Sequence, residues 1–289
     1  MDFLITFVNG LSLGGIYAMI ALGYTMVYGI AKMLNFAHGD IIMVGAYAVF
    51  STLMLGSGIT EKILAVLVSV VVCTLLGIGV ERFAYRPLRG ASPLAVLITA
   101  IGVSYLLQGM AQLIFGARSQ PVDFTIKGSI AGINYSTIIT LAVATVIMIG
   151  LTVFVKYAKT GRAMIAVSED RAAAQLMGIN VNKIITITFA IGSALAACAS
   201  VFYLMQIPST SPTLGSMPGI KAFTAAVIGG LGSIPGAMLG GVLLGIIEKI
   251  SLSIPELAPY TTAIEFSLLI VILLVKPTGI LGKKRREKV

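Results

Sequence analysis

Long apolar stretches, separated by short polar intervals, run through the whole of this sequence. A helix needs about 20 predominantly apolar residues to cross a bilayer. Of the 289 residues, 57% are hydrophobic and only 11% are charged, whereas soluble domains carry roughly 25% charged residues. The sequence therefore predicts an all-α fold, a polytopic membrane helix bundle that forms a single transmembrane domain over residues 1–289.

The apolar stretches predict about nine membrane segments, some of them broken or half-length. The seventh segment is short and ends in the glycine-rich sequence GGLGSIPG, so we expect it to cross as a broken helix. In chain order, the expected segments cover residues 4–30, 41–55, 63–80, 92–115, 135–155, 184–205, 223–233, 237–250 and 263–275.

The net charge of +9 comes mainly from cations in short loops and in a basic C-terminal tail. Cytoplasmic loops of membrane proteins carry an excess of Lys and Arg. We therefore expect three segments to be cytoplasmic, and counting spans back from them places the N-terminus outside. These segments are the loop at 82–89, the polar interval at 156–183 and the tail at 276–289. The same distribution argues against nucleic-acid binding.

The interval at 156–183 is the longest polar stretch of the chain. It predicts a surface helix with Ser168 as its N-cap and with Glu169 and Asp170 in the first turn, where the helix dipole favours anions. Gly178 can take the left-handed conformation that ends a helix. The apolar residues between these ends share one face: Ala172, Ala173, Leu176 and Met177. A helix of this kind across the end of a bundle forms a docking surface.

Two polar breaks interrupt the apolar stretches, an early one at Asn35–Asp40 and a late one at Gly229–Gly236. Irregular backbone at membrane depth is tolerated only where it is packed in protein or lines a wet cavity. We therefore expect the translocation path to involve these breaks. The candidate path residues are Asn9, Asn35, His38, Gly39, Asp40, Gly229, Gly230, Gly232 and Ser233.

The early break contains the single histidine, His38. One interpretation is a proton relay with Asp40, because ionisable groups inside spans are functional by default. The favoured interpretation is that Asn35, His38 and Asp40 satisfy backbone groups at a helix break. Glu248 and Glu265 lie in or beside apolar runs, where either could line a path, and interfacial solvation is the favoured role for both. No metal site is expected, because no cluster supplies three or four ligands.

The sequence contains neither the nucleotide-binding pattern GxxxxGK[ST] nor the metalloprotease pattern HExxH. We therefore expect no catalytic residue, no cofactor bound by this chain and no enzymatic activity. A path, a docking helix and the absence of an energy-converting motif indicate the membrane subunit of a transporter that another chain powers.

Three motifs carry a family resemblance: LNFAHGDIIMVGAYA at 34–48, AVSEDRAAAQLMGI at 166–179 and AAVIGGLGSIPGAMLGG at 225–241. Over nearly its whole length, the chain resembles the permease subunits of bacterial branched-chain amino acid ABC importers, and in particular the smaller, basic-tailed permease of the pair. The resemblance implies alternating-access transport of leucine, isoleucine and valine across the inner membrane. The implied partners are a second homologous permease, two cytoplasmic ATPases that hold ATP and Mg, and a periplasmic or lipid-anchored binding protein.

The stretch Ala172–Gly178 resembles the permease signature that begins Glu-Ala-Ala and has Gly after three further residues, with Ala172 in the Glu position. The position and capping of this stretch, with the degenerate motif as support, predict ATPase docking or helix shaping by Arg162, Ser168, Glu169, Asp170, Arg171, Ala173, Leu176 and Gly178. An idle cytoplasmic loop is the alternative for this stretch.

Two alternatives for the whole chain stay open. Permeases for urea and short-chain amides look similar around Asn35–Gly39. A stand-alone small-solute channel is the alternative from another class. Such a channel has no ATPase partner, and the docking helix argues against it.

Overall fold

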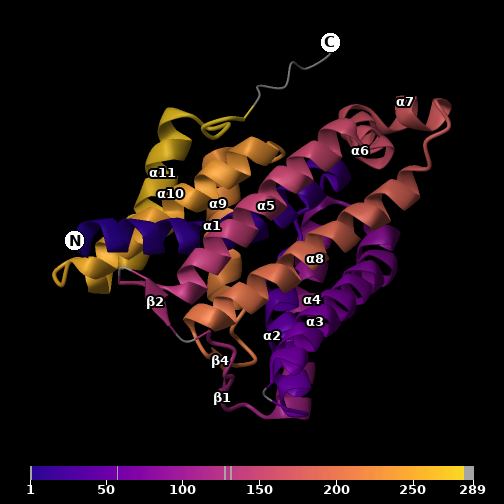
Figure 1. The fold of residues 1–289 in the computed structure, drawn as a ribbon. Coiled ribbons are helices and arrows are strands. Elements are labelled where there is room, and N and C mark those ends of the chain that lie inside the picture. The colour runs from indigo at the N-terminus through magenta and orange to yellow at the C-terminus, as the bar shows by residue number, and fades with distance from the viewer. Residues whose placement is uncertain (1, 57, 127, 131, 283–289) are drawn as a thin grey trace.

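The protein is described by a computed structural model that covers residues 2–56, 58–126, 128–130 and 132–282. The chain folds into a helical bundle with two small antiparallel strand pairs at one end (Figure 1). The elements in chain order are α1 (Asp2–Ala31), α2 (His38–Leu53), α3 (Ile59–Val80), the π-helical turn η1 (Glu81–Tyr85), the 3-10 turn η2 (Arg86–Leu88), α4 (Pro93–Phe115), β1 (Gln120–Pro121), β2 (Ser129–Ile130), β3 (Ile133–Asn134), α5 (Tyr135–Tyr157), α6 (Lys159–Glu169), α7 (Arg171–Leu176), α8 (Val181–Gln206), β4 (Ser209–Thr210), α9 (Ser216–Gly229), α10 (Ile234–Ser253), η3 (Ala258–Tyr260) and α11 (Thr261–Val275).

Within the described residues, seven helical segments are long and apolar enough to cross a membrane, built on α1, α3, α4, α5, α8, α10 and α11. Two further helices, α2 and α9, have 16 and 14 residues. At 1.5 Å per residue these two helices are about 24 and 21 Å long, which is shorter than a hydrocarbon core of about 30 Å. The predicted bundle with some half-length segments is confirmed.

The bundle has two distinct ends. At the strand end, β1 pairs with β4 and β2 pairs with β3, and the Thr137 hydroxyl at the start of α5 donates to Asn9 of α1 at 3.0 Å. At the opposite end, which we call the α7 end, Arg171 donates to the carbonyls of Ile30 and Ala31 at the C-terminus of α1. Helix α1 therefore contacts the start of α5 through Asn9 and the α7 end through its last carbonyls.

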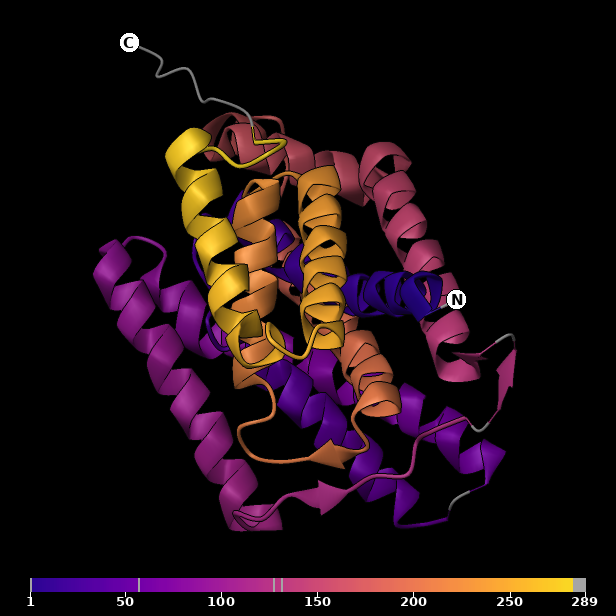
Figure 2. The same cartoon turned by 90° about the vertical axis from the view of Figure 1, so that its left-hand side faces the viewer.

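The cation-bearing segments meet at the α7 end. Arg89, after η2, donates to the side chain of Asn182 at the start of α8. The chain after α11 returns to the end of α9, where the N–H groups of Ile280 and Leu281 donate to Ile228 and Gly229 at 2.8 and 2.9 Å. Figure 2 shows this return beside α6 and α7. Residues 283–289 of the predicted tail lie outside the described residues.

Close packing of α1 on α10 forms part of the core. A Cβ atom at Gly14 would lie 2.7 Å from the Cα of Val242, and one at Gly10 would lie 2.9 Å from the Cα of Ile246. Small residues allow membrane helices to approach this closely. Helices α1 and α8 are the most buried spans, whereas α4, α5 and α11 are the least buried. The bundle is therefore built around α1 and α8.

Candidate functional site

The polar interval forms two helices, α6 and α7, instead of the single expected helix. Asp170 separates them in an extended conformation, and its carboxylate accepts from the N–H groups of Ala172 and Ala173 at 2.9 and 3.0 Å. The prediction that Ser168 caps the helix is wrong, because the Ser168 hydroxyl donates to the Ile165 carbonyl inside α6 at 2.7 Å. An anionic cap that binds two N–H groups also complements the helix dipole.

The end of α7 follows the prediction. Gly178 has a φ of +79°, in the left-handed region that glycine adopts without a Cβ penalty. The Gly178 and Ile179 N–H groups donate back to Gln175 and Ala174 at 2.9 and 3.0 Å. Asn180 then caps α8 by accepting from the Lys183 N–H at 3.0 Å. The turn therefore fixes α7 against the start of α8.

Helix α7 presents an apolar face outward. Leu176 is 89% exposed and Met177 is 81% exposed. Ala172 and Ala173 are exposed on the same short helix, whereas Ala174 is buried against the bundle. Exposed apolar patches with a polar surround mark interaction sites. The four residues of the predicted docking face thus lie where another chain can reach them.

Two anchors connect this docking face to the membrane helices. Helix α6 buries Gly161, Met164 and Val167, and a side chain at position 161 would collide with the backbone of α5. Arg171 binds the last carbonyls of α1, as cations near a helix C-terminus do. Burial, together with the nearby cation of Arg89, lowers the pKa of Arg171. The predicted docking residues Arg162 and Glu169 are exposed on α6.

A buried network holds the neighbouring η1–η2 loop. Glu81 is completely buried, forms an ion pair with Arg89 and accepts from the Thr186 hydroxyl at 2.8 Å. Arg89 also binds Asn182. The loop at 82–89 is thereby tied to the first turns of α8, close to α7.

The early break lies inside the bundle, where Asn35, His38 and Asp40 are each at most 2% exposed. Their proposed role in satisfying the backbone is wrong for Asn35 and Asp40, because the N–H groups of His38 and Asp40 bind the carbonyls of Asn35 and Ala37. The two polar side chains reach other elements instead. Asn35 accepts from the Tyr85 hydroxyl and Asp40 accepts from the Gln108 amide, both at 2.8 Å.

His38 packs between helices with little hydrogen bonding. Its ring meets the edge of Tyr24 at a centroid distance of 4.7 Å, and a side chain at Gly23 would collide with it. Among the described residues, neither Nε2 of His38 nor Nδ2 of Asn35 has a hydrogen-bond partner. The neighbouring Gly39 meets the start of α9, where a Cβ would lie 2.6 Å from the Gly215 carbonyl oxygen. Unpaired polar atoms in a protein interior are uncommon, and the assignment of the early break to the path stays a prediction.

The late break is a tight turn between α9 and α10 at the α7 end. Gly230 and Gly232 have φ values of +110° and +90°, and the Ser233 hydroxyl accepts from the Gly236 N–H at 3.2 Å to cap α10. A Cβ at Gly29 in the last turn of α1 would lie 3.4 Å from the Cα of Gly232. The two breaks are therefore not brought together.

The candidate path residues are distributed along α1. Asn9 lies at the strand end, the early break packs against α1 at Gly23, and the late break packs against Gly29. The structure thus places Asn9, the early break and the late break at three successive positions along α1.

Sequence reasoning missed a charged cluster in the interior. Lys221 of α9 lies 2.8 Å from Glu248 of α10 and 3.2 Å from Glu265 of α11. The Tyr17 hydroxyl of α1 donates to Glu248 at 2.7 Å. Interfacial solvation of the two glutamates is therefore wrong. A lysine inside an otherwise apolar helix was the available signal, because such a residue needs a buried anionic partner.

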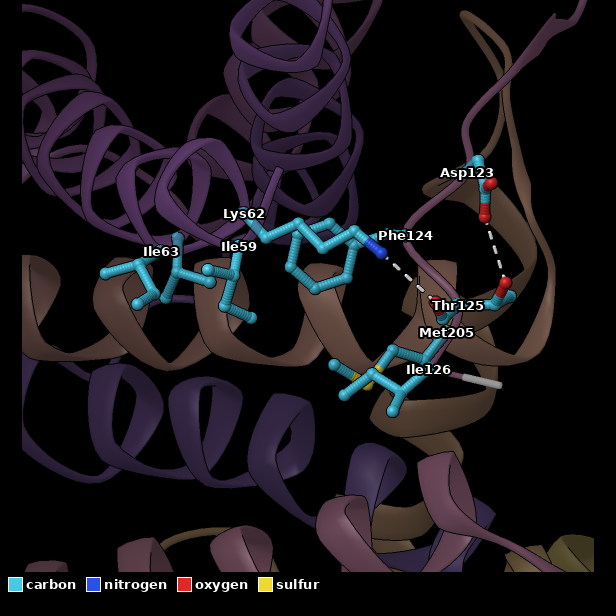
Figure 3. A pocket seen from close by; sticks show the side chains of 9 residues that line it. Ile59, Lys62, Ile63, Asp123, Phe124, Thr125, Ile126 and Met205 are labelled. Carbon is cyan, nitrogen blue, oxygen red and sulfur yellow. Dashed lines mark hydrogen bonds between the residues drawn. The ribbon is translucent and has the colours of Figure 1, made fainter. Parts of the chain in front are cut away.

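A cavity of about 490 Å³ lies at the strand end (Figure 3). It is formed by the start of α3, the segment at 123–126 and Met205 of α8. Lys62 donates to the Thr125 carbonyl at 3.1 Å and lies 5.8 Å from the centre of the Phe124 ring. Its lining residues include none of the predicted path residues, so it is separate from the early break.

Comparisons with known proteins agree with this architecture. The family model described as the permease component of branched-chain amino acid transport systems matches residues 6–274. The permease protein BraD of Pseudomonas aeruginosa, described as part of a high-affinity branched-chain amino acid transport system, is 45% identical, with 98% of this chain and 96% of BraD covered. The LivH protein of Salmonella typhimurium, with the same description, is 43% identical, with 97% of this chain and 96% of LivH covered.

Two solved structures share the fold. A metal-chelate type ABC transporter in an inward-facing conformation matches with a TM-score of 0.54 at 15% identity, covering 94% of this chain and 87% of that chain. PsaBC from Streptococcus pneumoniae, in complex with Fab, matches with a TM-score of 0.50 at 16% identity, covering 96% and 93%. At these identities the likeness concerns the fold alone. Because the family model and the curated relatives both extend over nearly the whole chain, this chain belongs to the family of permease components of branched-chain amino acid transport systems.

Proposed function

We propose that this chain is a membrane subunit of an ATP-driven importer that carries leucine, isoleucine and valine across the bacterial inner membrane. The descriptions of BraD and LivH, which match this chain over nearly their whole length, support this substrate class. The chain itself hydrolyses nothing in this proposal. ATP and Mg bind to two separate cytoplasmic ATPase subunits.

The exposed face of α7 is the observation that carries the proposal. Leu176 and Met177 lie on a short helix that Asp170 caps and that Arg171 ties to α1. An apolar face held on a rigid support fits a groove on a partner, whereas an idle loop needs neither the cap nor the anchor. We assign this face to the ATPase, with Arg162 and Glu169 at its polar rim.

The distribution of Lys and Arg supports an orientation in which the α7 end of the bundle is cytoplasmic. The loop at 82–89, the interval at 156–183 and the start of the tail share the α7 end, and Lys and Arg accumulate on the cytoplasmic side of membrane proteins. The α7 end then faces the ATPases, and the C-terminus is cytoplasmic. The strand end, with the N-terminus, faces the binding protein outside.

Coupling between the ATPase and the path runs through α1. Arg171 joins α7 to the last carbonyls of α1, and α1 leads directly into the early break at Asn35–Asp40. A displacement of α7 therefore acts on the segment between α1 and α2. In alternating access, closure of the ATPases moves this segment relative to α9, which meets it at Gly39. A second permease completes the path from the opposite side.

The docking assignment is tested by introducing a charge on the apolar face. The variant Leu176→Asp in the tagged full-length chain is purified in mild detergent, and the co-purifying proteins are identified by mass spectrometry. We expect the wild type to recover an ATPase and a second permease, and the variant to recover at least about tenfold less ATPase, equivalent to about 1.4 kcal/mol. Leu55→Asp is the matched control, because Leu55 is comparably exposed between α2 and α3.

Two outcomes would contradict the docking assignment. Recovery of this chain alone, as a stable homo-oligomer, would favour the stand-alone channel. Equal recovery of ATPase with Leu176→Asp and the wild type would remove α7 from the interface. The substrate class is tested separately, by titrating the co-purified binding protein with valine, leucine, isoleucine and urea. Binding of urea alone would favour the amide permease alternative.

A further inference from the structure

The interior cluster contains more acids than cations. It consists of four side chains from four helices, Tyr17 (α1), Lys221 (α9), Glu248 (α10) and Glu265 (α11), and we call it the four-helix cluster. Two carboxyl groups share one ammonium group. Neither the docking face nor the early break uses these residues, so they need an explanation of their own.

The contacts differ between the two carboxyl groups. Oε1 of Glu248 lies 2.8 Å from the Lys221 ammonium, and its Oε2 accepts from the Tyr17 hydroxyl at 2.7 Å. Glu265 contacts Lys221 through Oε1 at 3.2 Å. Its Oε2 is buried without a donor among the described residues. The side chain of Glu265 is 0% exposed, compared with 10% for Lys221 and 12% for Glu248.

This asymmetry indicates which carboxyl group carries the charge. Glu248 has donors on both oxygens, as an ionised carboxylate requires when buried. An ionised Glu265 would leave one charged oxygen without a donor inside the bundle, which is strongly unfavourable. A proton on Oε2 removes the charge and turns that atom into a donor. Glu248 contacts the same Lys221 ammonium as Glu265, so its carboxyl group is the acceptor available to this hydrogen bond.

Within the part of the chain that the structure describes, Lys221 is the only cation that forms an ion pair with either glutamate. Tyr17 on α1 and Tyr203 on α8 are the other titratable groups that interact with Glu248. Both are neutral as phenols. The ring of Tyr17 also lies 5.9 Å from the Lys221 ammonium, measured to its centroid. One cation and two acids reach electrical neutrality only with one bound proton.

We propose that Glu248 and Glu265 together bind one proton, held mainly by Glu265, so that the four-helix cluster is neutral inside the membrane. With the proton bound, the four-helix cluster joins α9, α10 and α11 to α1. Loss of the proton leaves a second negative charge that one ammonium group cannot neutralise. Helices α9, α10 and α11 then separate more readily from α1, so the contact that the four-helix cluster makes between these helices depends on the bound proton. This proposal does not depend on the transported solute or on the ATPase.

Infrared spectroscopy of the full-length chain, purified with whatever subunits accompany it, tests the proposal directly. A protonated carboxyl group has a carbonyl stretch separate from that of a carboxylate. We expect the wild type at neutral pH to show an acid band that disappears in Glu265→Gln, which preserves the shape of the side chain. Absence of any acid band in the wild type would overturn the proposal without the need for a variant.

Two further variants distinguish a shared proton from an ordinary ion pair. In Lys221→Met both carboxyl groups lack a cation, so both bind protons and the acid band grows by about one carboxyl group per chain. In Glu248→Gln the remaining Glu265 pairs with Lys221 and ionises, so the band is lost. An unchanged band in Lys221→Met would contradict the charge count.

Asp40→Asn is the matched control, because Asp40 is also a buried carboxyl group but lies at the early break with Gln108 as its partner. The acid band that we assign to the four-helix cluster should persist in this variant. Loss of the whole acid band in Asp40→Asn, together with its retention in Glu265→Gln, would place the proton at the early break and overturn the proposal. The pull-down of partner chains is a separate measurement from the spectral difference between variants, so failure of the proposed function would be recognised separately.

Discussion

The early and late breaks both interrupt apolar runs of the sequence, but they differ in the way they are stabilised. Both interrupt apolar helices, and both lie against α1. At the early break, Asn35 and Asp40 place polar side chains in the interior, where Tyr85 and Gln108 bind them. At the late break, glycines remove side chains so that the α9–α10 turn packs directly against the backbone near Gly282. Polar side chains connect the early break to other elements, whereas backbone packing holds the late break.

This difference separates two roles. The backbone-packed turn is rigid, because a side chain at Gly229, Gly230 or Gly236 would collide with another segment of backbone. A break with polar side chains can exchange partners when neighbouring helices move, because side-chain rotation changes its hydrogen bonds without unfolding a helix. We therefore expect the late break to determine stability and the early break to determine transport. Four substitutions test this expectation, in decreasing order of effect.

Gly230→Leu should have the largest effect. The φ of Gly230 is +110°, and a Cβ would lie 2.6 Å from the Gly282 nitrogen. Left-handed strain and overpacking together should destabilise the fold by about 3 kcal/mol, measured as a lower thermal unfolding midpoint in detergent. Gly116→Leu is the control, because Gly116 also has a positive φ but nothing lies within 4 Å of its Cβ. Equal losses in the two variants would mean that strain alone acts and that the packing is unimportant.

Asp40→Ala should come next. It removes the carboxylate that accepts from Gln108 and leaves the amide group of Gln108 without that partner. Losing a charge-assisted hydrogen bond costs about 2 kcal/mol. A double-mutant cycle with Gln108→Ala measures the coupling, and uptake in reconstituted vesicles measures transport. Coupling near zero would show that the pair does not hold the early break.

Tyr85→Phe should have a smaller effect on stability. It removes the hydroxyl that donates to Asn35 and preserves the ring, which packs 5.4 Å from that of Phe189. We expect a loss of about 1.5 kcal/mol and a clear change in the transport rate, because Asn35 becomes free to rotate. A normal rate with reduced stability would make this contact purely structural.

Ser233→Ala should have the smallest effect. The Ser233 hydroxyl caps α10 by accepting from the Gly236 N–H, and loss of a cap costs about 1 kcal/mol. Transport per folded molecule should stay the same, because the late break is held mainly by backbone packing. A slowed transport rate at normal yield would place Ser233 in the path and remove the distinction between the two breaks.

Sequence reasoning located the helices but not all of their partners. The apolar runs identified the spans, and glycine at position 178 identified the end of α7. Ser168 was a reasonable cap by type, yet Asp170 takes that role, because the chain bends there and Asp170 reaches two N–H groups. The sequence predicted Asp170 in the first turn of the helix, and the packing of α6 against α5, which local sequence does not show, accompanies the bend at Asp170.

The four-helix cluster shows more clearly that local sequence does not identify the partners of a residue. Tyr17 and Glu248 are separated by 231 positions, and Lys221 and Glu265 by 44. No local pattern connects them, because the rotation of each helix about its axis depends on packing across the bundle. An acid in an apolar run is compatible with an interface, a path or an ion pair until the neighbouring helices are known.

The sequence by itself determined which segments enter the membrane, where most of them end and which end of the bundle collects the cations. These properties follow from the transfer of side chains between water and lipid and from backbone hydrogen bonds, which are largely local. Only the tertiary structure decided that the early break is interior, that the late break is a turn at the α7 end and that two glutamates share Lys221. These features depend on contacts between helices that are distant in the sequence. Close packing at glycines and the pairing of buried charges determine which of these contacts form.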